Sequence, residues 1–228
     1  LMDPYYSDDA VTIYHGDCLD ILPALPIADL VVTDPPYIIG AMSAGQMDAK
    51  ANGRWPDMMN SALWFGAWIG RLKIRHEGAL WQFCNWRTLP VLMRAACDQN
   101  LPVASMLVWD KETIGPGGPN ALRPAYELVA LLPRPGFNIP NRSVSDVWRC
   151  KSGGKPHDHP AEKPEPLVSR IIQVSEIPQR GVVLDPFMGS GTTLAAAKRL
   201  GHRSIGIDAE ERWCEVAAQR IAQGVLAL

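Results

Sequence analysis

Two short, largely apolar runs in this chain each end in an aspartate that is followed by a turn. The first run covers residues 28–33 and leads into an Asp-Pro-Pro-Tyr tetrapeptide at residues 34–37, and the second covers residues 182–184 and leads into Asp185. Runs of this kind are typical of strands buried in a parallel sheet. Because such sheets bind ligands at the carboxyl ends of their strands, the pattern predicts that cofactor and substrate meet at one sheet edge.

Strand-like and helix-like patterns alternate along the chain. We expect strands at residues 11–14, 28–33, 79–83, 103–108, 126–132, 181–184 and 204–207, and helical turns or helices at 18–25, 62–72, 89–98, 164–174, 192–200 and 209–222. This alternation indicates an α/β fold, a doubly wound and mostly parallel Rossmann-like sheet. Within it, the strands at 103–108 and 126–132 are expected to pair as an antiparallel hairpin.

The length of 228 residues predicts one domain, residues 1–228, with insertions. Residues 38–60 contain several glycines and methionines and show little periodicity, so we expect a mobile loop that leaves the active-site edge. Residues 134–162 are rich in Pro, Gly, Ser, Asn and basic side chains. We interpret this second segment as a loop-rich target-recognition insertion.

The formal net charge of -2 gives no overall attraction to a polyanion, so nucleic-acid binding must come from a local basic surface. The insertion supplies one, because Asp146 is its only acid between residues 134 and 155. For each basic side chain, the alternative is a charged loop that contacts only water. The candidates for phosphate contacts are Arg134, Arg142, Arg149, Lys151 and Lys155.

The five cysteines are widely scattered and form no CxxC pair, which argues against a disulfide framework and a zinc ribbon. The sequence shows no secretion signal and no apolar segment long enough to cross a bilayer, and it therefore predicts a soluble, cytoplasmic protein. Cys150 with His157, Asp158 and His159 is an alternative zinc site, but the spacing is unusual, and we expect no metal.

A glycine loop follows the second apolar run. Residues 189–193 read Gly-Ser-Gly-Thr-Thr and open a helix, whose N-terminal N–H groups suit the close approach of a cofactor. Thr192 stands where a nucleotide-triphosphate loop needs lysine, and Leu194 stands where a dinucleotide fingerprint has its third glycine. Asp208 ends the next strand, at the spacing of an acid that accepts hydrogen bonds from ribose hydroxyls. The alternative is a tight turn with a helix-capping aspartate.

These motifs occur in one order along nearly the whole chain. In that order they resemble the β class of DNA amino-methyltransferases, which use S-adenosylmethionine and in which the catalytic half precedes the cofactor loop. The stretches that carry the resemblance are Tyr14-His15-Gly16-Asp17-Cys18, Asp34-Pro35-Pro36-Tyr37, His159-Pro160-Ala161-Glu162-Lys163-Pro164, Asp185-Pro186-Phe187-Met188-Gly189-Ser190-Gly191-Thr192-Thr193 and Gly206-Ile207-Asp208.

The resemblance implies S-adenosylmethionine as the cofactor. It implies that Asp17 accepts from the adenine amine, that Asp208 holds the ribose hydroxyls in place of the family's frequent glutamate, and that Lys163 pairs with the cofactor carboxylate. The full set implied to bind the cofactor is Asp17, Cys18, Asp34, Lys163, Asp185, Phe187, Gly189, Ser190, Gly191, Thr192, Thr193 and Asp208.

The tetrapeptide supplies the candidate catalytic residues Asp34, Pro35, Pro36 and Tyr37. An exocyclic amine is a weak nucleophile, because its lone pair is delocalised into the ring. Hydrogen bonds from the amine to the Asp34 carboxylate and the Pro35 carbonyl would localise that lone pair toward the sulfonium methyl. Tyr37 offers a face on which an extruded base can stack. Because the sulfonium is already electrophilic, positioning contributes most and no metal is required.

We therefore expect site-specific methylation of adenine N6 in double-stranded DNA, by base flipping and direct in-line transfer. The aspartate that heads the tetrapeptide resembles adenine enzymes more than the serine-headed variant of many cytosine N4 enzymes, which are the main alternative. RNA or protein-glutamine methylation and a DNA-binding relic without turnover are further alternatives. Relatives of this class suggest a homodimer. Residues that border the base pocket or, alternatively, form core or surface pairs are Trp109, Asp110, Lys111 and Glu127.

Overall fold

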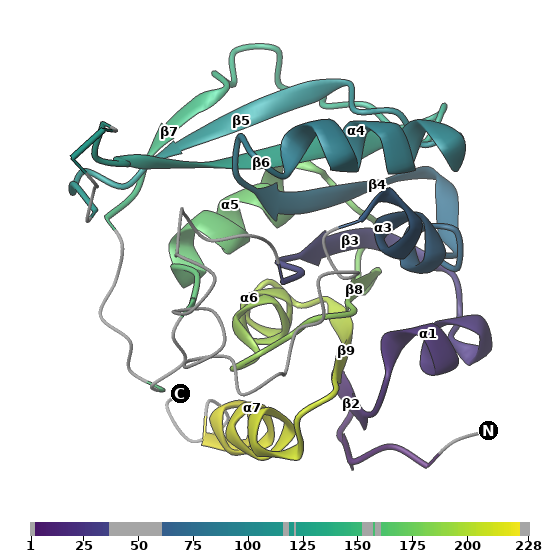
Figure 1. Ribbon diagram of the computed structural model, residues 1–228. Helices are drawn as coiled ribbons and strands as arrows, with labels where there is room; N and C mark the ends of the chain where they lie inside the picture. The colour runs from purple at the N-terminus through teal and green to yellow at the C-terminus, as the bar shows by residue number, and fades with distance from the viewer. Residues whose placement is uncertain are drawn as a thin grey trace.

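One nine-stranded sheet forms the centre of the protein, and helices cover both of its faces (Figure 1). The structure is a computed structural model that describes residues 3–36, 61–115, 119–120, 122–151, 157 and 161–223. The loop expected at residues 38–60 therefore lies outside the described residues. In order across the sheet, the strands are β1 (Tyr6–Ser7), β2 (Val11–His15), β9 (Arg203–Asp208), β8 (Val182–Asp185), β3 (Ala28–Thr33), β4 (Ile74–Cys84), β6 (Tyr126–Pro133), β5 (Ser105–Asp110) and β7 (Val147–Arg149).

The middle of the sheet is parallel. Strands β2, β9, β8, β3 and β4 run in the same direction, and β6 pairs antiparallel with both β4 and β5. The α/β fold and the antiparallel hairpin of β5 and β6 are confirmed. Two edge strands were not predicted, β1 beside β2 and β7 beside β5 within the 134–162 segment. With two and three residues, they are too short to show an alternating pattern.

Helices pack on both faces because successive strand residues point to opposite sides of the sheet. Val31 belongs to an apolar cluster with helices α1 (Cys18–Ile21), α3 (Ala62–Ile69) and α4 (Leu89–Asp98), and the 3-10 helix η1 (Leu22–Ala24) packs there too. Leu30 and Val32 belong to a second cluster with α5 (Glu165–Val174) and α6 (Thr192–Arg199). The last helix, α7 (Glu211–Gln223), packs against α6 and β2. Among the described residues, no helix has the length and apolar character that crossing a membrane requires.

The chain reverses direction across the sheet between β3 and β8. It continues from β3 toward β4 on one side, and from β8 toward β9 on the other. The loops after these two strands diverge and leave a crevice, which is the usual ligand position in such a sheet. We call this side of the sheet the ligand edge and define it by Asp34, Cys84, Asp185 and Asp208, which end or directly follow β3, β4, β8 and β9.

Candidate active site

A small cavity opens at the ligand edge between β3 and β8. Asp34 and Asp185 line it from the two strand ends, Lys163 lines it from the start of α5, and most of the 187–193 segment closes its other side. The structure thus brings the acidic turn and the glycine loop, which are about 150 residues apart in the sequence, to one cavity. Pro35 is buried and Pro36 half-buried beside it, whereas Tyr37 lies outside the described residues.

The glycine loop needs glycine at two positions. Gly189 and Gly191 have φ angles of 51° and 78°, in the left-handed region that side chains with a Cβ disfavour. A Cβ at Gly191 would also lie 2.9 Å from the Cβ of Ala217 on α7, which is too close. Helix α6 begins immediately afterwards at Thr192. The first backbone N–H groups of a helix have no partner within the helix, and Thr192 and Thr193, which carry two of them, line the cavity.

Asp208 fastens this loop to the end of β9. Its carboxylate accepts hydrogen bonds from the backbone N–H of Gly189 and of Glu210, each at 2.9 Å. Burial raises the pKa of Asp208 to about 6, although the two backbone hydrogen bonds oppose the increase. A carboxyl group in this setting changes its charge just below neutral pH.

Asp17 lies at the neighbouring strand end. Strand β2 pairs with β9 so that His15 stands opposite Asp208, and the N–H of Gly16 donates to the Asp208 carbonyl at 2.9 Å. Asp17 then caps α1 by accepting from the N–H of Leu19 at 2.8 Å. Cys18, the next expected cofactor residue, is buried, and burial raises the pKa of its thiol to about 12. The two predicted ribose and adenine contacts thus stand on adjacent strands.

Asp185 ties the two halves of the crevice together. It is buried and accepts hydrogen bonds from the Thr33 hydroxyl at 2.7 Å and from the N–H of Phe187 at 3.1 Å. Burial raises the pKa of Asp185 to about 7. The ring of Phe187 packs against Trp64 and Trp68 of α3, with centroids 5.5 and 5.3 Å away. The start of the loop is therefore fixed both by the hydrogen bonds of Asp185 and by the packing of Phe187 against α3.

Asp34 belongs to a chain of alternating charges. Lys163 Nζ lies 2.5 Å from Asp34 Oδ2 and 3.2 Å from Glu127 Oε2, and Lys111 donates to the other oxygen of Glu127. The Lys163 side chain is only 8% exposed. Of the four residues expected to border a base pocket, Lys111 and Glu127 thus connect to Asp34. Trp109 instead is buried in the core, where its ring nitrogen donates to the Cys150 carbonyl.

Arg220 on α7 was missed by sequence reasoning. It donates to Glu162 and Glu165 at the start of α5, at 3.1 Å each, and to the Ser190 carbonyl and the Thr192 hydroxyl at 3.3 and 3.1 Å. One guanidinium, only 12% exposed, therefore fixes the segment that carries Lys163 against the glycine loop. Nothing near Arg220 in the sequence signals this role, because all of its partners are distant along the chain.

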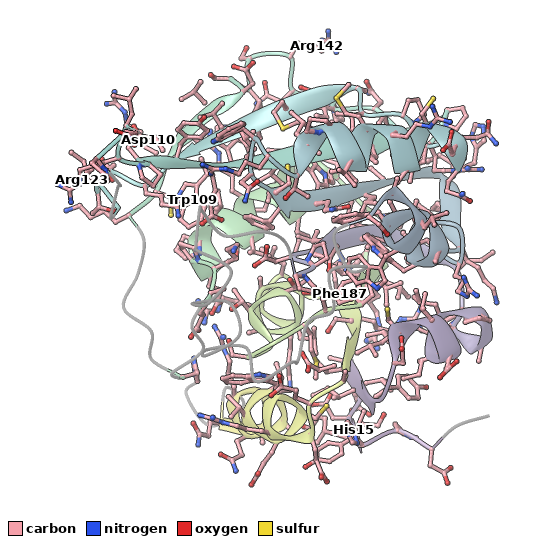
Figure 2. The ribbon with its side chains drawn as sticks, viewed as in Figure 1. His15, Trp109, Asp110, Arg123, Arg142 and Phe187 are labelled. Carbon is pink, nitrogen blue, oxygen red and sulfur yellow. The ribbon has the colours of Figure 1, made fainter. Side chains whose placement is uncertain are left out.

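The predicted basic surface is divided between two edges of the sheet. Arg149 stands opposite Asp110 at the end of β7, on the same side as the ligand edge, and the exposed Lys151 follows it. Arg134 lies at the opposite edge, where its N–H donates to Gly78 near the start of β4. Figure 2 shows Arg142 far from both Asp110 and Phe187. The structure therefore brings neither Arg134 nor Arg142 to the ligand edge, and Lys155 lies outside the described residues.

The described residues contain no cluster of three or more His, Cys, Asp and Glu side chains that could hold a metal ion. His157, part of the alternative zinc site, forms a 2.9 Å hydrogen bond through Nδ1 with Glu162. Asp158 and His159 lie outside the described residues.

Comparison with known proteins gives matches along most of the chain. A family model described as DNA methylase matches residues 28–219. The type II methyltransferase M.ScaI of Streptomyces caespitosus is 28% identical over 269 residues, covering 96% of this chain and 83% of that protein. The DNA adenine methyltransferase YhdJ of Escherichia coli (strain K12) is 24% identical over 253 residues, covering 95% of this chain and 84% of that protein.

Solved structures share the fold. The M1.HpyAVI–SAM complex superposes with a TM-score of 0.70 at 22% identity, covering 92% of this chain and 99% of that chain. The PvuII DNA methyltransferase, described as cytosine-N4-specific, gives a TM-score of 0.72 at 18% identity, covering 95% of this chain and 88% of that chain. The sheet and its two helical layers are those of DNA methyltransferase structures.

Proposed function

The chain belongs to this family of DNA methylases, and from that premise we propose that it methylates the N6 amine of adenine in double-stranded DNA. As a family member it is a DNA methyltransferase that uses S-adenosylmethionine. The base and the residues that carry the reaction are the proposal. Its main support is that Asp34 and the glycine loop line the same cavity, so that a base held at Asp34 would contact a cofactor held by the loop.

The donor set at the ligand edge fits S-adenosylmethionine, which supplies an electrophilic methyl group on a positively charged sulfur. The carboxylate of Asp208 suits the ribose hydroxyls, the side chain of Asp17 suits an adenine amine, and the N–H groups at the start of α6 suit a polar ligand. The proposed cofactor-binding residues are Asp17, Cys18, Asp34, Lys163, Asp185, Phe187, Gly189, Ser190, Gly191, Thr192, Thr193 and Asp208.

We assign the transfer step to Asp34, Pro35, Pro36 and Tyr37. The Asp34 carboxylate and the Pro35 carbonyl accept hydrogen bonds from the amine, so that its lone pair points out of the ring plane toward the methyl group. The two prolines hold that carbonyl rigidly, because each fixes its own φ. After transfer the methylated nitrogen is positively charged, and Asp34 accepts its surplus proton. The flipped base stacks on Tyr37.

The assignment to adenine depends on the aspartate at position 34, and product analysis tests it. Duplex DNA incubated with the protein and S-adenosylmethionine is digested to nucleosides and analysed by mass spectrometry. We expect N6-methyladenine to be the only methylated nucleoside that increases. An increase in N4-methylcytosine would reject the assignment to adenine and leave the methyltransferase activity in place.

Contacts to DNA phosphates are proposed for Arg149 and Lys151, which lie beside the ligand edge. The double variant Arg149→Ala/Lys151→Ala is expected to weaken duplex binding by about 10-fold and to reduce the salt dependence of the binding constant by about two ion equivalents. Arg142→Ala is the matched control, because it removes an equally exposed arginine of the same segment, far from Asp110 and Phe187. Fluorescence anisotropy between 50 and 200 mM salt measures both effects. Equal losses in the control and in the double variant would reject the assignment.

We also propose that residues 1–228 act as one domain and that the 134–162 segment reads the target sequence. Strand β7 within this segment is part of the central sheet, which supports a fixed position for the flanking residues. Exchange of residues 134–146 with the equivalent part of a relative of different specificity is the direct test.

A further inference from the structure

We propose that Lys163 is a positioning residue whose ammonium, held in turn by Glu127, keeps the Asp34 carboxylate charged and oriented toward the target amine. The inference rests on the proposed function, in which Asp34 contacts that amine. It assigns to Lys163 a task in the transfer step, in addition to any contact with the cofactor.

The charges around Lys163 alternate and compensate one another. Lys163 lies between the carboxylates of Asp34 and Glu127, and Lys111 pairs with Glu127 from the far side. Two negative and two positive groups from four separate segments therefore form one chain of ion pairs, with Lys163 buried at 8% side-chain exposure and the other three partly buried. A buried ion is stable only when it is paired and hydrogen-bonded, so each member of this chain depends on its neighbours.

The position of the ammonium is fixed from several directions. Besides its two carboxylate partners, Lys163 Nζ lies 5.2 Å from the centre of the Phe83 ring, a cation–π distance. Pro164, the next residue, has a φ of -63° and caps the start of α5, which restricts the backbone at the base of the lysine. Because the ammonium is held rigidly, it also holds the Asp34 carboxylate in one position. A displacement of about 1 Å in the position of a reacting group lowers the rate by about 10²-fold.

Electrostatics make the aspartate depend on this lysine. Burial alone would lower the pKa of Lys163, but the charges of Asp34 and Glu127 raise it above its ordinary value. Burial alone would raise the pKa of Glu127, but Lys163 and Lys111 lower it. Lys163 therefore stays positive, and Glu127 stays negative, throughout the neutral range. A fixed positive charge next to Asp34 favours its ionised form.

Two other titratable groups that the described part of the chain places near Asp34 do not replace this effect. Burial, with a contribution from the charge of Asp34, raises the pKa of the Cys84 thiol at the end of β4 to about 12. Asp185 on β8 has a pKa raised to about 7, mainly by burial, with a smaller contribution from Asp34. Neither group carries a positive charge in any form. Among the described residues, Lys163 is the cation that forms an ion pair with Asp34.

Two lysine variants and one matched control test the proposal. Lys163→Met removes the charge and the hydrogen bonds, whereas Lys163→Gln keeps a neutral donor of similar size. Lys198→Met is the control, because Lys198 also pairs with an aspartate, Asp8 at 2.7 Å, and is partly buried at 23% exposure. For each protein, we would measure the pH dependence of kcat on duplex DNA and the Kd for S-adenosylmethionine by calorimetry. The titration of the Asp34 carboxyl carbon would be followed by NMR in the absence of DNA.

Loss of the Lys163 charge is expected to shift the acid limb of the kcat–pH profile to higher pH by about 1 to 3 pH units, and to shift the NMR titration midpoint of Asp34 by a similar amount. The control variant is expected to shift neither. Unchanged positions of both in the folded Lys163 variants would overturn the proposal. So would a more than tenfold weaker cofactor affinity with an unchanged pH profile, since that result assigns Lys163 to the cofactor carboxylate alone. An inactive wild-type protein would reject the proposed function, and the NMR titration would still decide whether Lys163 controls Asp34.

Discussion

Replacing Asp34 with asparagine is expected to lower kcat for methyl transfer to DNA by about 10³-fold or more. The amide keeps the size of the side chain and one carbonyl oxygen, but it cannot accept the proton of the methylated amine. It also places a neutral group beside the Lys163 ammonium, which is 2.5 Å from Asp34 Oδ2 in the wild type. Single-turnover transfer of a labelled methyl group to duplex DNA measures the loss directly.

Two controls separate chemistry from folding in this experiment. The midpoint of thermal unfolding should stay close to wild type, because Lys163 keeps Glu127 as a partner. Because Asp34 is also a proposed cofactor-binding residue, the Kd for S-adenosylmethionine is measured as well, and kcat is compared at saturating cofactor. Asp34→Glu retains the charge but moves it outward by one methylene group, and we expect it to lose about 10²-fold. Activity of Asp34→Asn within tenfold of wild type would show that the carboxylate is not the group that activates the amine.

The central strands were predictable because their signals are local. The runs at 28–33 and 182–184 are short, apolar and followed by turns, and they form β3 and β8 almost at the expected bounds. Strand β4 begins five residues earlier than expected, at Ile74 rather than Ala79. Its first part contains His76 and Glu77, which are exposed and interrupt the apolar pattern that marks a buried strand.

The contacts that join the motifs were not predictable, because they depend on long-range packing. Asp34 and Lys163 are 129 residues apart in the sequence, and Arg220 lies 58 residues beyond Glu162. Each motif indicates what its own residues can bind. Only the order of strands across the sheet determines which motifs meet, and β3 and β8 become neighbours through contacts that no local pattern encodes.

The basic residues of the 134–162 segment show the same difference between proximity in the sequence and proximity in the structure. Arg134 and Arg149 are only 15 residues apart and are equally plausible phosphate contacts in the sequence. Strand β6 ends at the edge opposite Asp34, however, and the chain crosses the sheet again before β7 ends beside Asp110. Clustering of charge along the chain therefore overestimates clustering of charge in space.

Replacing Asp208 with alanine is expected to weaken the binding of S-adenosylmethionine by about 10²-fold or more. Hydrogen bonds to a charged group contribute about 1.5–3 kcal/mol each, and the carboxylate is proposed to accept two from the ribose. The variant also releases the N–H groups of Gly189 and Glu210, which loosens the glycine loop. Asp29→Asn is the matched control, because Asp29 also accepts from a backbone N–H, that of Val182, but at the amino end of β3. Calorimetry on the two variants measures the difference in Kd.

The pH dependence of cofactor binding provides a second test of Asp208. Its pKa is raised to about 6, mainly by burial, so the carboxylate is charged above that pH and gains a proton below it. The protonated form loses an acceptor, and S-adenosylmethionine should therefore bind progressively more weakly as the pH falls through about 6 toward 5. The Asp208→Asn variant should bind S-adenosylmethionine weakly at every pH, without the change in Kd near pH 6. A smaller change in Kd near pH 7 should persist, because Asp185 has a pKa raised to about 7. A wild-type Kd that stays constant between pH 5 and 7 would remove Asp208 from the ribose contact and leave it as an anchor of the glycine loop alone.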